Sequence, residues 1–303
     1  MYFPILRGKQ NELLALRELL NDGVLSKKIL PIIEPVSPSS TFRILLESFS
    51  DSNRKIAVIQ NSSVADYEGF KDADISEIKS KDNFVPALVL EGSDNESLSD
   101  YSNINKMAII GEKSDFNDSS LIDGNTYLVI EPNNRSAVRK LRNSTDFLVE
   151  MHDQFNKQDR NVDYLSKTDE LFSTEHLYYK EDGYYGFSDY SVIGSDYSSA
   201  GFAAKAVAIH LVYFDENNEL RVHHFVSDSN DNIQNPALKA HEALEKLVKF
   251  VSNPSFDKTK NDSEALREFE ELYKIDKYSG LGYIKKLSIK HHFEIMGRYL
   301  DKD

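Results

Sequence analysis

The feature that most constrains this chain is a short apolar run that recurs along its first half. Seven such runs occupy residues 2–6, 29–33, 56–59, 84–90, 107–110, 127–130 and 147–149, and most end at a carboxylate or an amide. Most starts lie roughly 20 to 28 positions apart, the length of one strand and one helix. Runs of this length bounded by turn formers are typical of buried strands in a parallel sheet. The pattern therefore predicts successive βα units.

The number of units favours an α/β chain with a (β/α)8 TIM-barrel-like fold. We expect residues 206–213 to supply the eighth strand, and such a barrel uses about 250 residues, which fits a chain of 303. An open doubly wound sheet would give the same pattern until the strand order is known. The near-regular repeat, which continues without a break in composition, favours the barrel.

The pattern changes after residue 150. Residues 164–201 are dense in Tyr, Asp, Ser and Gly, which indicates a long insertion, taken as 154–205. Residues 206–213 and 220–226 flank a polar turn and predict an antiparallel hairpin near the last strand. Helical patterns at 236–251, 263–274 and 284–300 predict a C-terminal helical cap. We therefore expect a barrel domain over 1–235, with a helical region over 236–303 packed on it.

Composition excludes several kinds of protein. The chain has no cysteine, which rules out disulfides, thiolate metal sites and a thiolate nucleophile. Its formal net charge of −14 argues against a generally basic nucleic-acid coat. No apolar run is long enough to cross a membrane, and charge at Arg7 and Lys9 is unlike a signal peptide. We expect a cytoplasmic protein with no membrane partner, and the sequence has no motif for ATP or NAD.

Several strings in the sequence are distinctive when taken together. They are residues 2–10 with Glu12 and Leu16, residues 30–35, Asp153 with Phe155, Arg160, Asp163 and Tyr164, residues 186–190, residues 206–210, and residues 285–288 before His291, His292 and Glu294. In combination they resemble the "beta protein" family of phages and bacterial mobile elements. The resemblance implies a setting in phage–host conflict, such as antiphage defence, or in mobile-element biology. It also implies a nuclease-like partner.

The polar residues that end the apolar runs are the first candidates for chemistry. In a barrel, the carboxyl ends of all strands meet on one face, where active sites of such barrels lie. Glu34, Glu91, Glu131 and Asp153 could there bind Mg²⁺ or Mn²⁺ through oxygen ligands. Arg7 and Lys9 could hold a phosphate. Alternatively, these acids only stabilise helix N-termini through the helix dipole.

A second group lies at the end of the seventh run. Asp153, Arg160, Asp163 and Tyr164 fall within about ten residues and could form a buried network that binds a metal or orients a substrate. Equally, Arg160 could only pin the loop through a carboxylate. Tyr190 in the same insertion could stack on a base, or belong to a tyrosine-rich surface that binds a protein.

Histidine and lysine supply the remaining candidates. His210 lies on a strand face with small alanines, so it has room for a ligand and could act as general acid or base. A structural histidine is the alternative. Lys285 and Lys286 open a basic stretch, within a segment from residue 236 that has 13 basic and 12 acidic residues. That stretch could bind phosphate, or be a solvated helix start.

Two functions follow from these residues. The first is a metal-dependent phosphohydrolase or nuclease-associated enzyme acting on nucleic acid or nucleotide, with Glu131, Asp153 and His210 in the chemistry. The second is a non-catalytic recognition module that binds a phage protein or a partner nuclease through Tyr190 and the basic tail.

Overall fold

The computed structural model describes residues 1–62, 64, 72–91, 98, 100–101, 104–116, 118–197 and 205–302. The chain divides into two compact units. The first comprises Met1–Leu13, Lys27–Asp153 and Glu175–Tyr190, and the second comprises Leu14–Ser26, Gln154–Thr174 and Ser191–Asp303. No helix in the described ranges combines the length and the apolarity needed to cross a bilayer.

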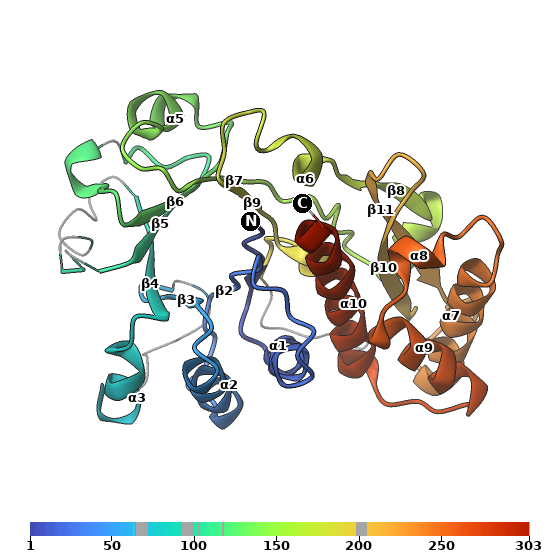
Figure 1. Ribbon diagram of the computed structural model, residues 1–303. Coiled ribbons are helices and arrows are strands. Elements are labelled where there is room, and N and C mark those ends of the chain that lie inside the picture. The colour runs from blue at the N-terminus through green and yellow to red at the C-terminus, as the bar shows by residue number, and fades with distance from the viewer. Residues whose placement is uncertain are drawn as a thin grey trace. The chain divides into compact units, whose positions relative to one another are not determined.

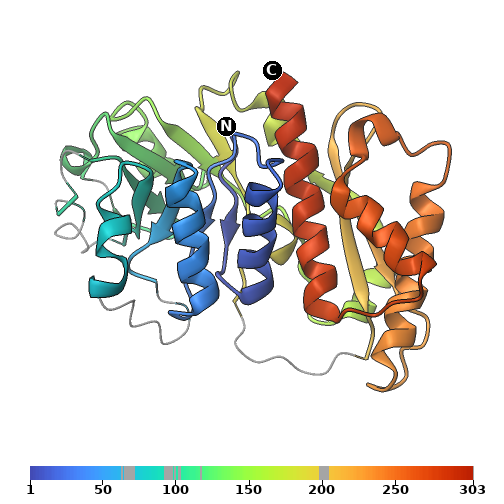
Figure 2. The same ribbon diagram turned by 60° about the horizontal axis from the view of Figure 1, so that its bottom comes forward.

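The first unit is a parallel eight-stranded barrel of the (β/α)8 type (Figure 1). Its strands, in spatial order, are β1 (Ile5–Leu6), β2 (Ile32–Ile33), β3 (Ile56–Ile59), β4 (Phe84–Val89), β5 (Lys106–Ile110), β6 (Thr126–Ile130), β7 (Leu148–Met151) and β9 (Gly186–Ser188). The helical elements are α2 (Ser40–Asp51), α3 (Asp72–Lys79), η1 (Ser119–Leu121), α5 (Arg135–Leu141) and α6 (Glu175–Tyr178). In Figure 2 the blue helix α2 runs alongside the strands on the outside of the sheet.

Hydrogen bonds between the first and the last strand close the barrel. The amide of Phe3 donates to Phe187 O at 2.9 Å, and the amide of Ile5 donates to Asp189 O at 2.8 Å. The Tyr2 ring stacks on Phe187 at 5.1 Å, and its hydroxyl donates to Asp189 Oδ1 at 2.7 Å. This seam brings the two end strands of the sheet together, so the barrel is nearly closed.

The expected position of the eighth strand, 206–213, is wrong. β9 has only three residues, Gly, Phe and Ser, and lies in the polar segment taken for an insertion. A Cβ on Gly186 would lie 2.5 Å from Met1 O and 2.6 Å from the Phe3 ring, so the seam requires glycine there. At this strand the backbone must come close to Met1 and Phe3, which requires glycine in place of an apolar side chain. A search for apolar runs therefore misses it.

Apolar side chains fill the interior of the barrel. They alternate with outward residues along each strand, as the pleat dictates. The inward set is Phe3, Ile5, Leu30, Ile32, Ala57, Ile59, Val85, Ala87, Met107, Ile109, Tyr127, Val129, Val149 and Met151. The interior is a packed core, so a site enclosed by the ring of strands can lie only at an end of the barrel.

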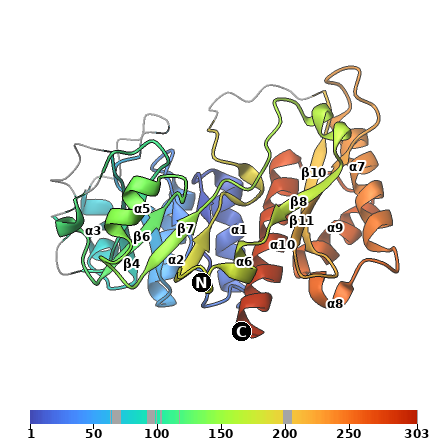
Figure 3. The ribbon, with the colours of Figure 1, turned by 90° about the horizontal axis from the view of Figure 1, so that it is seen from above.

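The second unit is built on a three-stranded antiparallel sheet in the order β10 (Ala208–Phe214), β11 (Leu220–Val226), β8 (Asp169–Ser173). The remaining elements are η2 (Asn161–Ser166), η3 (Ser191–Ile193), α7 (Pro236–Val251), α8 (Lys258–Asn261), α9 (Glu264–Lys274) and α10 (Leu281–Lys302), while the division between the units passes through α1 (Gln10–Asn21). Val207, Ile209 and Leu211 belong to one apolar core with side chains of α7, α9 and α10, and β10 contacts α7 and α10 directly. Figure 3 shows these helices beside the sheet.

The hairpin and the three C-terminal helices are confirmed, but the compact units differ from the expected division at residue 235. The hairpin belongs with the C-terminal helices, because its apolar face and theirs form one core. The segment 154–205 is no single insertion, since it contributes β8 and η2 to one unit and β9 to the other. Its residues 198–204 lie outside the described residues.

Polar residues of α10 fix the start of α9. Glu294 accepts hydrogen bonds from the amides of Glu264 at 2.7 Å and Ala265 at 3.2 Å. His291 is fully buried between Ser263 Oγ at 2.7 Å and Val212 O at 2.8 Å. The Ser263 hydroxyl also caps α9 by accepting from the amide of Leu266 at 2.8 Å. The first amides of α9 have no acceptor within the helix, and Glu294 and Ser263 accept their hydrogen bonds.

We predict that Gly186→Ala destabilises the protein by about 3 kcal/mol, because the new methyl group overpacks the seam. The matched control is Gly124→Ala, where a Cβ would meet nothing within 4 Å. The control is expected to change the free energy of unfolding by less than about 0.5 kcal/mol. Urea unfolding measures both, and equal stabilities would contradict the role of the seam.

A second prediction concerns pH. Burial lowers the pKa of His291 to about 4, whereas an unfolded histidine titrates near 6.5. The unfolded chain binds the proton first, so this contribution to stability is present above about pH 6.5 and is lost towards pH 4. Wild type should therefore lose about 3 kcal/mol more unfolding free energy between pH 7 and 4 than His291→Gln. Parallel pH profiles from urea unfolding would contradict this.

Candidate functional site

One ring of inward-facing positions lies just beyond the barrel core, at the carboxyl ends of the strands. Period-two alternation continues the inward rows of the eight strands to Arg7, Glu34, Asn61, Glu91, Gly111, Glu131, Asp153 and Tyr190. Four of these positions are carboxylates, one is a guanidinium and one is a phenol. We call this ring the barrel mouth.

Arg7 is the buried cation of the barrel mouth. Its guanidinium forms an ion pair with Glu34, and it lies 4.9 Å from the centre of the Tyr190 ring. The Arg7 amide donates to Glu12 Oε2 at 2.8 Å. Arg7 and Glu34 are 8% and 7% exposed, so the pair is largely removed from water. Glu34, expected as a metal ligand, forms an ion pair with Arg7.

Glu131 and Asp153 form the acidic side of the barrel mouth. Burial raises the pKa of Glu131, His152 lowers it, and the negative charges of Glu112 and Asp153 raise it further. Burial also raises the pKa of Tyr190. The positive charge of Arg7 lowers this pKa, and the negative charges of Asp153 and Glu131 raise it. Glu131 and Asp153 follow the neighbouring strands β6 and β7 in the same inward row, so both acids belong to the barrel mouth.

The other strand-end residues of the barrel mouth and its margin are exposed or bind the backbone. Glu91 is exposed and lines a surface hollow with Lys113 and Asp115. Lys9 is exposed in front of α1. The Asn61 amide exchanges hydrogen bonds with the backbone of Val89, at 2.7 and 2.9 Å, so it links β3 to β4.

Sequence reasoning missed a cluster on the outer side of β7. Glu150 and His152 continue the outward row of that strand beyond Leu148, which packs in the outer core. Glu175 of α6 completes the cluster, and one ligand atom from each of the three residues lies within 4.8 Å of the others. A Glu-x-His pair on one strand face was visible in the sequence. Glu175, 23 positions beyond His152, was not.

His210 belongs to the second unit, not to the barrel unit. Its Nδ1 lies 2.7 Å from Nδ1 of His224, whose Nε2 lies 3.2 Å from Glu170 Oε1. The carboxylate accepts from Nε2–H of His224, so Nδ1 of His224 accepts from His210 and the His210 lone pair is on Nε2. Burial lowers the pKa values of both histidines, which favours their neutral forms. His210 and Lys285 line a hollow of about 250 Å³ in this unit.

The expected network around Arg160 is not assembled. Arg160 is exposed and forms no ion pair with any residue in the described ranges. Tyr164 is buried, but its hydroxyl accepts from the amide of Gln158 at 3.0 Å and its ring packs on His224 at 4.5 Å. Asp153 belongs to the barrel unit, whereas Arg160 and Tyr164 belong to the second unit.

The basic stretch is mostly buried. Lys286 pairs with Glu18 at 2.7 Å, and Lys290 pairs with the same carboxylate at 3.0 Å. Lys286 and Lys290 are each 5% exposed, and His292 is fully buried. Of the two lysines expected to bind phosphate, only Lys285 is partly exposed. The sequence pattern could not reveal the acidic partner from α1.

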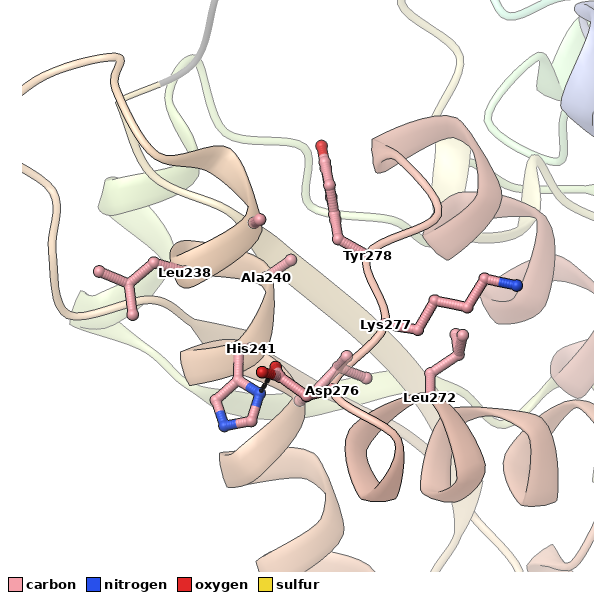
Figure 4. Close-up of a pocket in the computed structure, with 9 residues that line it drawn as sticks. Leu238, Ala240, His241, Leu272, Asp276, Lys277 and Tyr278 are labelled. Atoms are coloured by element: carbon pink, nitrogen blue, oxygen red, sulfur yellow. Dashed lines mark ion pairs between the residues drawn. The ribbon is translucent and has the colours of Figure 1, made fainter.

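A further hollow lies beside α7 in the second unit (Figure 4). Its lining is mainly apolar, with Leu238, Leu272 and Tyr278. His241 Nδ1 lies 2.9 Å from Asp276 Oδ1, but the Asp276 side chain is 83% exposed. The hollow thus has no desolvated reactive group.

No protein-family model, curated protein or solved structure matches this chain. The resemblance to the beta protein family therefore stays a prediction.

We predict that Glu34→Gln costs about 3 kcal/mol, because it leaves the Arg7 charge buried beside Tyr190 without its ion pair. The double variant Arg7→Met/Glu34→Leu should recover most of that loss, since it removes both charges. Glu112→Gln, at an exposed position, is the control and should change stability by less than about 0.5 kcal/mol. Urea unfolding tests all three, and a neutral Glu34→Gln would contradict the burial of the pair.

Proposed function

We propose that the barrel mouth hydrolyses a phosphate ester of a nucleic acid or nucleotide with the help of a divalent cation, Mg²⁺ or Mn²⁺. One observation carries the proposal: Arg7, which is paired with Glu34 and lies 4.9 Å from the Tyr190 ring, occupies the same inward ring at the carboxyl ends of the strands as two carboxylates, Glu131 and Asp153. Active sites of (β/α)8 enzymes are built at this end of the barrel.

Charge supports the requirement for a cation. The barrel mouth and its margin contain several carboxylates against the single buried guanidinium of Arg7. A phosphate group would be repelled by Glu131, Asp153 and Glu112 unless a cation neutralised them. Carboxylate oxygens are the ligands that Mg²⁺ and Mn²⁺ prefer. A bound cation would polarise the phosphoryl oxygens and activate water.

Residues of the barrel mouth would bind the cation and the phosphate. Asp153, which is exposed, would ligate the cation together with Glu131. Arg7 would hold a phosphate oxygen, because its contacts with Glu34 and Tyr190 restrict where its guanidinium can lie.

The motif resemblance supports a setting for this activity. We propose a component of a phage, a bacterial mobile element or an antiphage-defence system, with a nuclease-like protein or a phage protein as partner. The strings that carry the resemblance include residues 186–190, which comprise β9 and the two residues after it, Asp189 and Tyr190.

The alternative, a recognition module without catalysis, loses part of its support. It relied on Lys286 as a basic contact, yet Lys286 is buried and pairs with Glu18. Tyr190 lies beside Arg7 in the barrel mouth.

The test uses the purified full chain with bis(4-nitrophenyl) phosphate, then with single- and double-stranded DNA and RNA. We expect release of 4-nitrophenolate that requires Mg²⁺ or Mn²⁺ and stops with EDTA. Glu131→Gln and Asp153→Asn should each lower kcat by about 100-fold or more, with thermal midpoints unchanged within a few degrees.

The matched control is Glu47→Gln, which removes an exposed carboxylate paired with Arg43 on α2 and should leave turnover unchanged. Absence of cation-dependent turnover with every substrate would overturn the proposal. So would wild-type turnover in Glu131→Gln and Asp153→Asn. If Tyr190→Ala instead removed partner binding while those two variants kept it, the recognition module would be favoured.

A further inference from the structure

The geometry points to a metal site on the outer side of β7, made by Glu150, His152 and Glu175 and suited to a transition-metal dication such as Zn²⁺ or Mn²⁺. This site does not rest on the proposed hydrolysis, because none of its three ligands belongs to the barrel mouth. It joins the end of a barrel strand to the start of α6.

The ligand atoms are close to a coordinating arrangement. Glu150 Oε2 lies 3.7 Å from His152 Nε2, and one atom from each of the three residues lies within 4.8 Å of the others. Zinc bound at about 2.0–2.2 Å places tetrahedral ligand atoms about 3.4 Å apart. The cluster therefore needs only a small inward adjustment, and His152 and Glu175 are partly exposed and can make it.

Glu150 supplies an independent indication. Its residue is 4% exposed, and within the described part of the chain its Oε1 has no hydrogen-bond partner. A buried carboxylate oxygen without a partner costs free energy. The negative charges of Glu175 and Asp182 disfavour the ionised form of Glu150, whereas His152 favours it. A dication would supply both the missing partner and the opposite charge.

The ligand types select the metal. One imidazole with two carboxylates suits Zn²⁺, Mn²⁺ or Fe²⁺, whereas Mg²⁺ and Ca²⁺ prefer oxygen ligands alone. Three protein ligands also leave a coordination position for water or a small anion. This donor set differs from that of the barrel mouth, where Glu131 and Asp153 offer only oxygen.

The experiment titrates Zn²⁺ into the EDTA-treated and dialysed full chain, followed by calorimetry and thermal unfolding. We expect one equivalent to bind with higher affinity than any other and to raise the thermal midpoint, since it binds only the folded state. Glu150→Gln and His152→Gln should each weaken Zn²⁺ binding by about 100-fold or more, since losing even an outer partner of a metal ligand costs 10- to 100-fold. Without metal, Glu150→Gln should be at least as stable as wild type, because it removes a buried charge.

His241→Gln is the matched control. His241 also faces a carboxylate, Asp276, at 2.9 Å, but among the described residues this pair belongs to no group of three candidate ligands, so this variant should bind Zn²⁺ like wild type. Glu131→Gln and Asp153→Asn should bind Zn²⁺ within about threefold of wild type, which separates this site from hydrolysis at the barrel mouth.

Three results would overturn the inference. They are the absence of stoichiometric Zn²⁺ binding, wild-type affinity in both Glu150→Gln and His152→Gln, and loss of binding in Glu131→Gln or Asp153→Asn while Glu150→Gln retains it. The last result would move the metal to the barrel mouth.

Discussion

The seam between β1 and β9 is the constraint on which the candidate site depends. Gly186 has no Cβ, and the backbone of Met1 and the ring of Phe3 occupy the space that a Cβ would need. The amide of Ile5 then reaches Asp189 O at 2.8 Å. Arg7 and Tyr190 each follow one strand of this seam, so their contact at 4.9 Å exists only when the sheet is closed. Closure of the sheet thus brings the side chains at the strand ends together in one ring, the barrel mouth.

Strand alternation separates two kinds of chemistry on one short strand. Met151 and Asp153 belong to the inward row of β7, whereas Leu148 and Glu150 belong to its outward row. Successive positions point to opposite faces, so Asp153 joins the barrel mouth and Glu150 joins the cluster with Glu175. His152 interacts with both, because it pairs with Glu150 at 3.7 Å and lowers the pKa of Glu131. Replacing His152 should therefore change the environment of Glu150 on the outer side of the strand and of Glu131 on the inner side.

Much of the fold could be predicted because apolar burial has a sequence signature. The runs that became β1 to β7, the hairpin and the helix beginning at Pro236 all bury one face or both. β9 could not be found this way, because close backbone approach selected Gly186 and left no apolar run. Glu131 and Asp153 could be placed together because parallel strands end on one face. Glu34 could not be assigned, since nothing in its own sequence neighbourhood shows that Arg7 neutralises it. The burial of Lys286 likewise depends on Glu18, 268 positions away.

The sequence by itself determined the class of fold, most of the strands, the ring of strand-end acids and the absence of thiol chemistry. These properties follow from local periodicity and residue type. Only the tertiary structure decided which strand closes the barrel, which acids are paired, and that Glu175 meets Glu150 and His152. Such contacts join residues far apart in the chain, and their energies come from desolvation and opposite charge at short range, which no local pattern encodes.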